Sequence, residues 1–262
     1  EITCMEGTGM SNSLKGKVAL VTGGSRGLGA VIAETLADAG ADVAITYVAS
    51  RDKAEAVVAK LKAKGVRAVA LRSDQADPTA AKPLVEAVVA QLGRLDILVN
   101  NAAVVAKGQL VDDPALDTAT LDHQWQVNVM GAVATTRAAA PVLAEGGRLI
   151  FIGSRNGTLA LIPGVADYAG TKAALIGYAK GVARDLGPRN ITVNVVQPGA
   201  MPTDMMVEAL GSTTAPDAFL DMHPIRRIAT LEEVAALVNF LAGPNGGYIT
   251  GGVIDVAGGL GI

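Results

Sequence analysis

Short apolar runs alternate along this chain with longer stretches whose apolar residues recur at helical spacing. The long stretches at 28–40, 53–65 and 80–93 each end at a glycine, the residue preferred just after the last turn of a helix. Strands that alternate with helices predict βαβ units with right-handed crossovers, and hence a parallel sheet with helices on both faces. Seven strands are expected, at 18–23, 42–47, 67–72, 95–100, 148–153, 191–196 and 253–256.

The composition agrees with such a sheet. Hydrophobic residues make up 50% of the chain and aromatic residues only 3%, so the core must be built from aliphatic side chains, as in sheets buried on both faces. No repeat, linker or change in composition divides residues 14–262, which are predicted to form a single domain. Residues 1–13 are expected to be a disordered N-terminal extension. The Met-rich segment 204–229 interrupts the alternation and is predicted to be a helical lid over the substrate.

Charge and cysteine content exclude several classes of protein. The formal net charge of −3, without a basic block, argues against nucleic acid as a partner. Cys4 is the only cysteine, which argues against a disulfide framework and fits a reducing, cytoplasmic location. No apolar run reaches the ~18 residues of a membrane span, and the start lacks the pattern of a secretory signal, so no membrane partner is expected. His123 and His223 have no partner ligands at suitable spacing, so no metal is expected.

A glycine-rich sequence, Thr22 to Gly29, joins the first expected strand to the first expected helix. In such a turn, main-chain N–H groups and the positive end of the helix can bind a pyrophosphate. Gly23 would allow the tight turn, Gly27 the close approach of the ligand, and Gly29 the packing of helix on strand. A purely structural turn is the alternative, but the strand before and the helix after are the context that a dinucleotide site requires. The expected fold is therefore a Rossmann-type, doubly wound α/β domain.

The residues around the second strand favour NADP(H) over NAD(H). An NAD site usually has an acidic residue about 20 positions after the glycine-rich turn, at the carboxyl end of that strand. Asp42 has roughly the right spacing but precedes the strand, and no acidic residue follows Tyr47 before Asp52. Arg26 and Arg51 are instead placed to bind a 2′-phosphate, which suits a guanidinium. The alternative is that both are solvated surface arginines.

Seven short motifs follow one another in the sequence: TGGSRGLG at 22–29, DQ at 74–75, NNAA at 100–103, NV at 128–129, Ser154, YAGTK at 168–172 and QPG at 197–199. In this order they resemble the classical short-chain dehydrogenase/reductase family, and the resemblance extends from Leu14 to Gly259. Two positions depart from the family's pattern. Ala103 replaces a glycine, and Gln197 replaces an asparagine or alanine. Neither position supplies a reacting group, so the departures concern the loops and leave the chemistry intact.

Tyr168 and Lys172 are one helical turn apart, so their side chains project from the same face. Free tyrosine titrates near pH ~10, and a neighbouring ammonium is expected to lower the pKa of Tyr168. Ser154 follows an expected strand and therefore lies at the carboxyl edge of the sheet, where it can polarise a substrate carbonyl. The resemblance implies that Tyr168 is the general acid and base, that Lys172 also binds the nicotinamide ribose, and that Asn128 supports a water chain. For Asn128 the alternative is a helix-interior amide satisfied by the main chain.

The remaining cofactor contacts follow from the turn, the arginines and the resemblance. Asp74 looks like the residue beside adenine, and Thr203 looks like the one that reaches the carboxamide or phosphate of the nicotinamide end. The full set of expected cofactor-binding residues is Gly23, Ser25, Arg26, Gly27, Leu28, Gly29, Tyr47, Ser50, Arg51, Asp74, Gln75, Asn101, Ala102, Ala103, Tyr168, Lys172, Pro198, Gly199, Met201 and Thr203.

These residues together predict an NADPH-dependent carbonyl reductase that is reversible as an alcohol dehydrogenase. The candidate substrate walls are 104–110, 156–165 and the lid residues Met205, Met206, Leu210 and Phe219, which are mostly apolar and favour a neutral small-molecule ketone. The resemblance also suggests a homotetramer.

Two other functions remain as alternatives. One is a 3-oxoacyl-(acyl-carrier-protein) reductase, which needs a basic docking surface to which Arg137, Arg184 and Arg189 could contribute. The other is a non-catalytic NADP-binding regulator, which would have no reason to hold Ser154, Tyr168 and Lys172 together.

Overall fold

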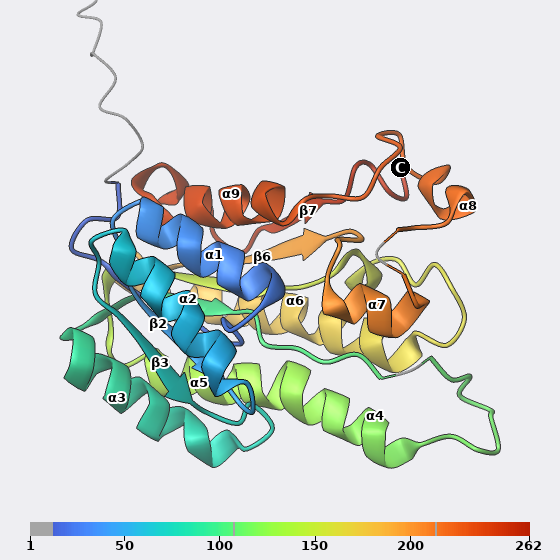
Figure 1. Ribbon diagram of the computed structural model, residues 1–262, viewed down its shortest axis with the longest axis horizontal. Coiled ribbons are helices and arrows are strands. Elements are labelled where there is room, and N and C mark those ends of the chain that lie inside the picture. Colours follow the sequence, from blue (N-terminus) through green and yellow to red (C-terminus); the bar gives the residue numbers. More distant parts are fainter. Residues whose placement is uncertain (1–12, 107, 213) are drawn as a thin grey trace, which may run out of the picture.

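The computed structural model describes residues 13–106, 108–212 and 214–262; the predicted N-terminal extension lies outside them, apart from Ser13. Seven parallel strands form one sheet in the order β3-β2-β1-β4-β5-β6-β7 (Figure 1). The strands are β1 (Val18–Val21), β2 (Asp42–Tyr47), β3 (Ala68–Arg72), β4 (Leu95–Asn100), β5 (Leu143–Ile152), β6 (Thr192–Pro198) and β7 (Val253–Val256). This is the predicted seven-stranded, doubly wound sheet.

Helices cover both faces of the sheet. On one face lie α1 (Gly27–Asp38), α2 (Arg51–Ala63) and α9 (Leu231–Ala242), whose buried residues pack against Val21, Ile45 and other strand side chains. On the other lie α3 (Ala81–Leu92), α5 (Ala132–Ala139) and α6 (Ala166–Leu186), packed around Leu20 and Phe151. Both clusters are almost wholly aliphatic, as the low aromatic content requires.

The helix between β4 and β5 is not uniform. It begins as α4 (Thr118–Trp125), widens into a π-helical stretch, η3 (Gln126–Gly131), and continues as α5. Gly131 lies against the main chain of Gln75, where a side chain would collide. A π-helical turn inside an α-helix often marks a functional site, and Asn128 lies within this one.

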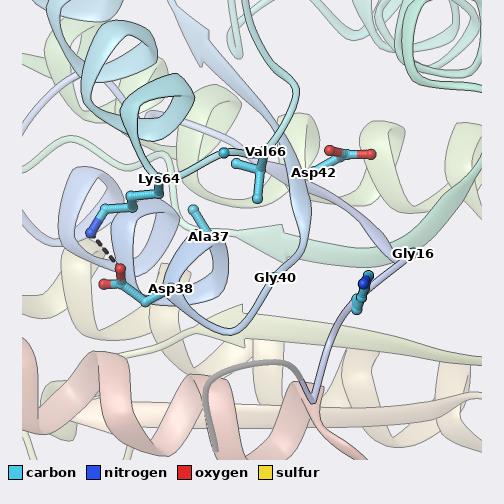
Figure 2. A pocket seen from close by; sticks show the side chains of 9 residues that line it. Gly16, Ala37, Asp38, Gly40, Asp42, Lys64 and Val66 are labelled. Atoms are coloured by element: carbon cyan, nitrogen blue, oxygen red, sulfur yellow. Dashed lines mark hydrogen bonds and ion pairs between the residues drawn. The ribbon is translucent and has the colours of Figure 1, made fainter.

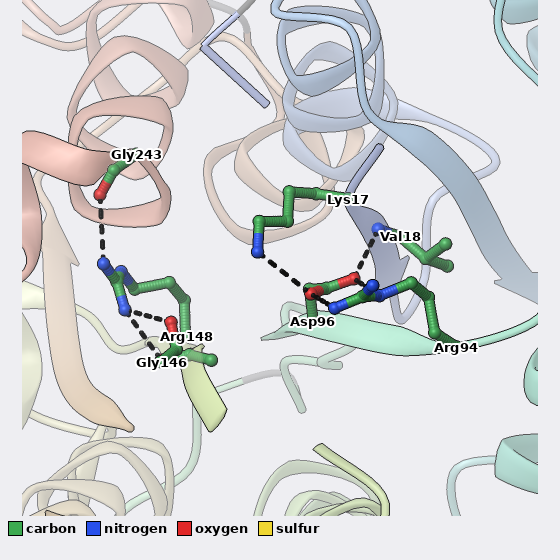
Figure 3. A network of polar contacts seen from close by, with 8 residues as sticks. Lys17, Val18, Arg94, Asp96, Gly146, Arg148 and Gly243 are labelled. Atoms are coloured by element: carbon green, nitrogen blue, oxygen red, sulfur yellow. Dashed lines mark hydrogen bonds and ion pairs between the residues drawn. The ribbon is translucent and has the colours of Figure 1, made fainter. Parts of the chain in front are cut away.

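At the amino edge of the sheet a buried carboxylate ties two strands together. The Asp96 side chain is 3% exposed and accepts hydrogen bonds from Val18 N (3.0 Å), Lys17 Nζ (3.3 Å) and Arg94 Nε (2.7 Å), as Figure 3 shows. Two cations and a main-chain N–H offset the cost of burying this charge. Ligands are expected at the opposite, carboxyl edge of the sheet.

Between β6 and α9 the chain forms two short helices, α7 (Asp204–Leu210) and α8 (Asp217–Leu220), within the segment predicted as a lid. Figure 1 shows them to one side of the sheet, beyond the end of β6. Thr203 caps α7 by accepting from Met206 N. No helix in the described part of the chain is both long and apolar enough to cross a bilayer.

Candidate active site

The predicted site residues gather at the carboxyl edge because all seven strands are parallel. Tyr47 ends β2, Asn101 follows β4, Ser154 follows β5, and Pro198 ends β6. The sheet order reverses between β1 and β4, so the crevice beside Gly23 lies at the position where α/β folds bind dinucleotides.

The glycine-rich turn lacks side chains where its neighbours leave no room for them. A Cβ at Gly23 would lie 2.9 Å from the Cα of Ala102, and one at Gly29 would collide with the main-chain oxygen of Gly23. Gly27 has a φ of +52°, which favours glycine. Gly24, which the sequence analysis passed over, lies against Ile45: its Cβ would be 2.6 Å from Ile45 Cγ2. The turn is therefore a bare main-chain cradle at the N-terminus of α1.

Two threonines that the sequence analysis missed hold this cradle in place. Thr46 Oγ1 accepts from Gly23 N at 2.9 Å, and Thr22 Oγ1 accepts from the N–H groups of Asn101 and Ala102 at 3.0 Å. The Asn101 side chain donates to the main-chain oxygens of Thr22 and Gly23, so it supports the turn. The sequence indicated Thr22 only as part of a motif. It could not indicate Thr46, because the role of that residue depends on the pairing of β1 with β2.

The residues expected at the adenosine end lie around β2 and β3. Ser50 and Arg51 begin α2, just after β2, and Arg51 is exposed. Asp74 accepts from Ala76 N in a tight turn after β3, and Gln75 is buried. Arg26 extends from the glycine-rich turn to α7, where its Nη1 lies 2.9 Å from Asp204 Oδ2. Arg51 is thus exposed just after the end of β2, whereas Arg26, also expected to bind a 2′-phosphate, is paired with Asp204 in α7.

Asp42 lies at the opposite edge of the sheet, as predicted. It lines a polar hollow with Asp38, Lys64 and neighbouring main chain, shown in Figure 2. Its carboxylate accepts from Arg67 Nε at 2.9 Å and from Arg67 Nη2 at 2.8 Å. Asp42 is therefore far from the crevice and cannot serve as the acidic residue of an NAD site.

Ser154, Tyr168 and Lys172 are brought together by β5 and α6. The hydroxyl of Ser154 accepts from Asn156 N at 3.2 Å, which leaves its proton free to be donated. Burial raises the pKa of Tyr168, and the nearby Ser154 hydroxyl opposes this only in part. Lys172 Nζ lies 5.7 Å from the centre of the Tyr168 ring. The three side chains thus form one polar cluster within an apolar site.

The expected net lowering of the Tyr168 pKa is not found, because burial of the phenol raises this pKa. The ammonium of Lys172, 3% exposed, donates to the main-chain oxygen of Ile152 at 3.0 Å and is directed toward β5. Burial lowers the pKa of Lys172 to about 8, while the pKa of Tyr168 is raised by its own burial. At neutral pH the cluster therefore holds a protonated tyrosine next to a predominantly charged lysine.

Asn128 is 1% exposed, and its amide pairs with the main chain of Val104. Its Oδ1 accepts from Val104 N at 2.8 Å, and its Nδ2 donates to Val104 O at 2.9 Å and to Thr171 Oγ1 at 3.3 Å. Thr171 in turn donates to the main-chain oxygen of Tyr168. Asn128 thus links the loop after β4 to the start of α6, and its role in a water chain remains a prediction.

Trp125 and Asp167 pack behind the tyrosine. Trp125 Nε1 donates to Asp167 Oδ1 at 2.8 Å, and its ring lies against Gly170, where a Cβ would be 3.0 Å away. Trp125 is thus a packing residue, and the Asp167 carboxylate is occupied by the indole N–H.

Three segments contribute to the surroundings of the cluster: the loops after β4 and β5, and the segment 204–229, which begins with α7. The loop after β4 meets the loop after β5, since a Cβ at Gly108 would be 3.1 Å from Gly164 O. From α7, in the segment predicted as a lid, Met205 Sδ lies 4.0 Å from the Tyr168 hydroxyl. Large apolar side chains are exposed on all three segments, namely Leu110, Val111, Ile162, Val207, Met222 and Ile225.

The main chain after β6, which is expected to hold the nicotinamide, is confined. A Cβ at Gly199 would lie 3.1 Å from Ala257 Cα, and Gly199 N donates to Val256 O. Met201 packs against the core on the α1 side, and Thr203 lies 3.9 Å from the Cβ position of Gly27. No group of three or more metal-ligating side chains occurs among the residues that the structure describes.

Comparison with known proteins places these features in context. Residues 23–261 match the family model described as enoyl-(acyl carrier protein) reductase. Versicolorin reductase 1 of Aspergillus parasiticus is 37% identical, over 95% of this chain and 98% of its own length. The 3-oxoacyl-(acyl-carrier-protein) reductase FabG of Staphylococcus aureus is 39% identical, over 93% of this chain and 98% of its own.

Solved structures agree with the sequence comparisons. A short-chain dehydrogenase of Burkholderia cenocepacia, crystallised in complex with NADP, is 46% identical and superposes with a TM-score of 0.89 over 96% of this chain and 100% of that one.

Proposed function

Because this chain belongs to the short-chain dehydrogenase/reductase family and is an NAD(P)-dependent oxidoreductase, we propose that it reduces a neutral ketone to a secondary alcohol with NADPH, reversibly. The observation that carries the proposal is the cluster of Ser154, Tyr168 and Lys172 at the carboxyl edge, beside the bare cradle of the glycine-rich turn.

The chain's own residues fit a dinucleotide. The turn packs so closely on its neighbours at Gly23, Gly24 and Gly29 that no Cβ atoms fit there. The N-terminus of α1 adds a dipole that favours a ligand's phosphates. Pro198, Gly199 and Thr203 would hold the nicotinamide end, and Lys172 the adjoining ribose. When bound, NADPH supplies the hydride.

Each member of the cluster then has a distinct task. Ser154 donates a hydrogen bond to the substrate carbonyl oxygen and orients it, while keeping its own proton. Tyr168, kept protonated by burial, transfers its proton to the same oxygen as negative charge develops there. The Lys172 ammonium, 5.7 Å from the tyrosine ring, stabilises the phenolate that remains. In the reverse direction the phenolate takes the proton from the alcohol.

Arg26 and Arg51 support the choice of NADPH. Arg51 follows the end of β2, where an adenosine ribose would lie, and Arg26 is in the glycine-rich turn. Asp42 is at the other edge of the sheet. The Burkholderia relative was crystallised with NADP. A measured preference for NADH in kcat/KM would overturn this assignment.

The substrate walls favour a bulky apolar ketone. Their exposed large side chains are apolar, and the arginines beside them are already paired: Arg226 with Asp217 and Asp221, and Arg227 with Glu233. A site with these pairings offers little to an anionic substrate. We also propose that residues 204–229 act as the lid of this site.

The second candidate is reduction of a 3-oxoacyl group on a carrier protein, which the similarity to FabG favours. Of the arginines considered for docking, Arg189 instead donates to the main-chain oxygens of Ala140 and Leu143, so it is occupied structurally. Arg137 and Arg184 remain exposed. This weakens the second candidate relative to the first.

A panel of cyclic, aromatic and aliphatic ketones, assayed by NADPH oxidation beside a 3-oxoacyl carrier-protein thioester, separates the two. Higher kcat/KM on free ketones supports the first candidate, and higher kcat/KM on the thioester supports the second. Binding of NADPH without turnover of any carbonyl would instead indicate a regulator. We further propose a cytoplasmic homotetramer, to be checked by light scattering and fractionation.

A further inference from the structure

Arg155 directly follows Ser154, but its side chain points away from the cluster. It is 14% exposed and contacts three separate parts of the chain. Its Nε donates to Leu260 O at 3.0 Å, its Nη1 donates to Thr158 Oγ1 at 2.6 Å, and Nη1 lies 3.3 Å from Asp255 Oδ2. One guanidinium thus joins the turn that carries Ser154 to the end of β7 and to residues 257–262, here called the closing segment.

The closing segment is itself held in place. Leu260 is 4% exposed, and Leu260 N donates to Ala257 O. The segment touches the loop after Ser154, because Gly261 lies against Leu159 with no room for a Cβ. It also touches the end of the lid, since Gly258 O accepts from Ile225 N at 3.0 Å and Gly259 packs against Pro224. In Figure 1 the end marked C lies beside α8.

The turn that carries Ser154 is short and depends on such contacts. Ser154 precedes η4 (Arg155–Gly157), a 3-10 turn, and its Oγ position is set by the hydrogen bond from Asn156 N. On the other side, Gln197 Nε2 donates to Ser154 O at 2.8 Å. Arg155 is the second anchor of this turn. Catalytic groups must be held within about 0.5 Å of productive geometry, so the loss of an anchor affects the chemical step.

We propose that Arg155 is a positioning residue: through Leu260, Thr158 and Asp255 it fixes the turn that presents Ser154 and couples it to the closing segment and the lid. The inference rests on the proposed carbonyl reduction. It adds a residue outside the cluster whose loss lowers the rate of the chemical step and leaves cofactor binding unchanged.

The test compares Arg155→Ala with Arg148→Ala in the full chain. Arg148 is a matched control, because it lies on β5, the strand that precedes Arg155, and also donates to main-chain oxygens, but toward the amino edge. Its acceptors are those of Gly146, Gly147 and Gly243. Both variants should unfold at lower temperature than the wild type. Only Arg155→Ala should lower kcat, by roughly 10- to 100-fold as expected for a misplaced catalytic group, with an unchanged Kd for NADPH.

Two milder variants keep the test informative if Arg155→Ala does not fold. Arg155→Lys retains a charge near Asp255 but cannot make all three contacts, so its kcat should lie between those of the wild type and the alanine variant. Asp255→Asn removes one exposed partner and should lower kcat by about two- to fivefold. An unchanged kcat in the folded Arg155 variants, or an equal loss in Arg148→Ala, would overturn the inference. If the wild type reduced no carbonyl, the proposed function itself would fail first.

Discussion

The ammonium of Lys172 lies 3.0 Å from the main-chain oxygen of Ile152, two residues before Ser154. This hydrogen bond connects α6 directly to the strand that carries the serine, and burial lowers the pKa of Lys172 to about 8. The lysine is therefore charged below pH 8 and loses its charge as the pH rises through that value.

A first prediction concerns the pH dependence of ketone reduction. If the ammonium stabilises the phenolate of Tyr168, kcat/KM should fall above an apparent pKa near 8, because this profile reports the groups of the free enzyme. Initial rates with NADPH from pH 6 to 10 measure it. Lys172→Met should have low activity, and its kcat/KM should not fall above pH 8. If the fall persisted in this variant, another group would be responsible for it.

The same residue should limit stability. The folded-state pKa of Lys172 is lowered from 10.5 to about 8, so the unfolded chain binds more protons between these values and stability rises with pH there. Lys172→Met should accordingly unfold at a higher denaturant concentration than the wild type at pH 7, and this advantage should shrink toward pH 10. If the wild type and Lys172→Met were equally stable at pH 7 and at pH 10, the hydrogen bond to Ile152 would offset the cost of burying the ammonium.

Removing the phenolic hydroxyl should stop proton transfer without affecting the fold. Tyr168→Phe is expected to lower kcat by roughly 100- to 10,000-fold, the range for a lost acid–base group. Its Kd for NADPH should change little. Tyr178→Phe is the matched control: Tyr178 is on the same helix and packs edge-to-face on Phe151, with ring centres 6.0 Å apart, and should keep wild-type activity.

The glycine-rich turn should not tolerate a side chain. Gly29→Ala places a Cβ against the main-chain oxygen of Gly23 and should weaken NADPH binding, measured by fluorescence titration. Gly177→Ala on α6 has nothing within 4 Å of the added Cβ and should leave binding unchanged while stabilising the fold by about 0.5–1 kcal/mol. If Gly29→Ala bound NADPH as tightly as the wild type, the proposal that the glycine-rich turn binds the cofactor would be refuted.

The two arginines should determine the choice of dinucleotide. Arg26→Ala combined with Arg51→Ala should raise KM for NADPH roughly 10- to 100-fold, as expected for lost hydrogen bonds to a charged group, and leave KM for NADH nearly unchanged. Asp204→Asn should act in the opposite direction, because it removes the partner that Arg26 has in the lid. If the double substitution raised KM for NADPH and for NADH equally, the arginines would not contact the 2′-phosphate.

Much of this architecture could be read from the sequence. The predicted bounds of β2, β4 and β7 agree with the structure, because each is a clear apolar run between turn residues. The start of β5 was missed: the strand begins at Leu143, which pairs with Leu95, and an irregularity in register then accommodates Gly146 and Gly147. Glycine is unfavourable inside a strand, and only the neighbouring strand shows that pairing continues through these two.

The site was less predictable than the fold. Motif spacing identified Ser154, Tyr168 and Lys172, but the direction of the Lys172 ammonium depends on how α6 packs against β5. The same holds for Asn128, whose amide is matched to Val104 across a loop, and for Arg155, whose partners lie 105 and 100 residues later at Leu260 and Asp255. Such contacts join residues that no local pattern relates.

The sheet has two edges, here called rims: the amino rim carries the polar cluster around Asp96, and the carboxyl rim carries the candidate active site. The carboxylate, its two cations and Val18 N share no partner with Ser154, Tyr168 or Lys172. Free-energy changes at independent sites add, so a substitution that strengthens the amino rim can offset one that weakens the substrate walls. Residues of the substrate walls can therefore be substituted to accept other ketones without altering the contacts of Asp96. This makes the chain a suitable starting scaffold for directed evolution of substrate range.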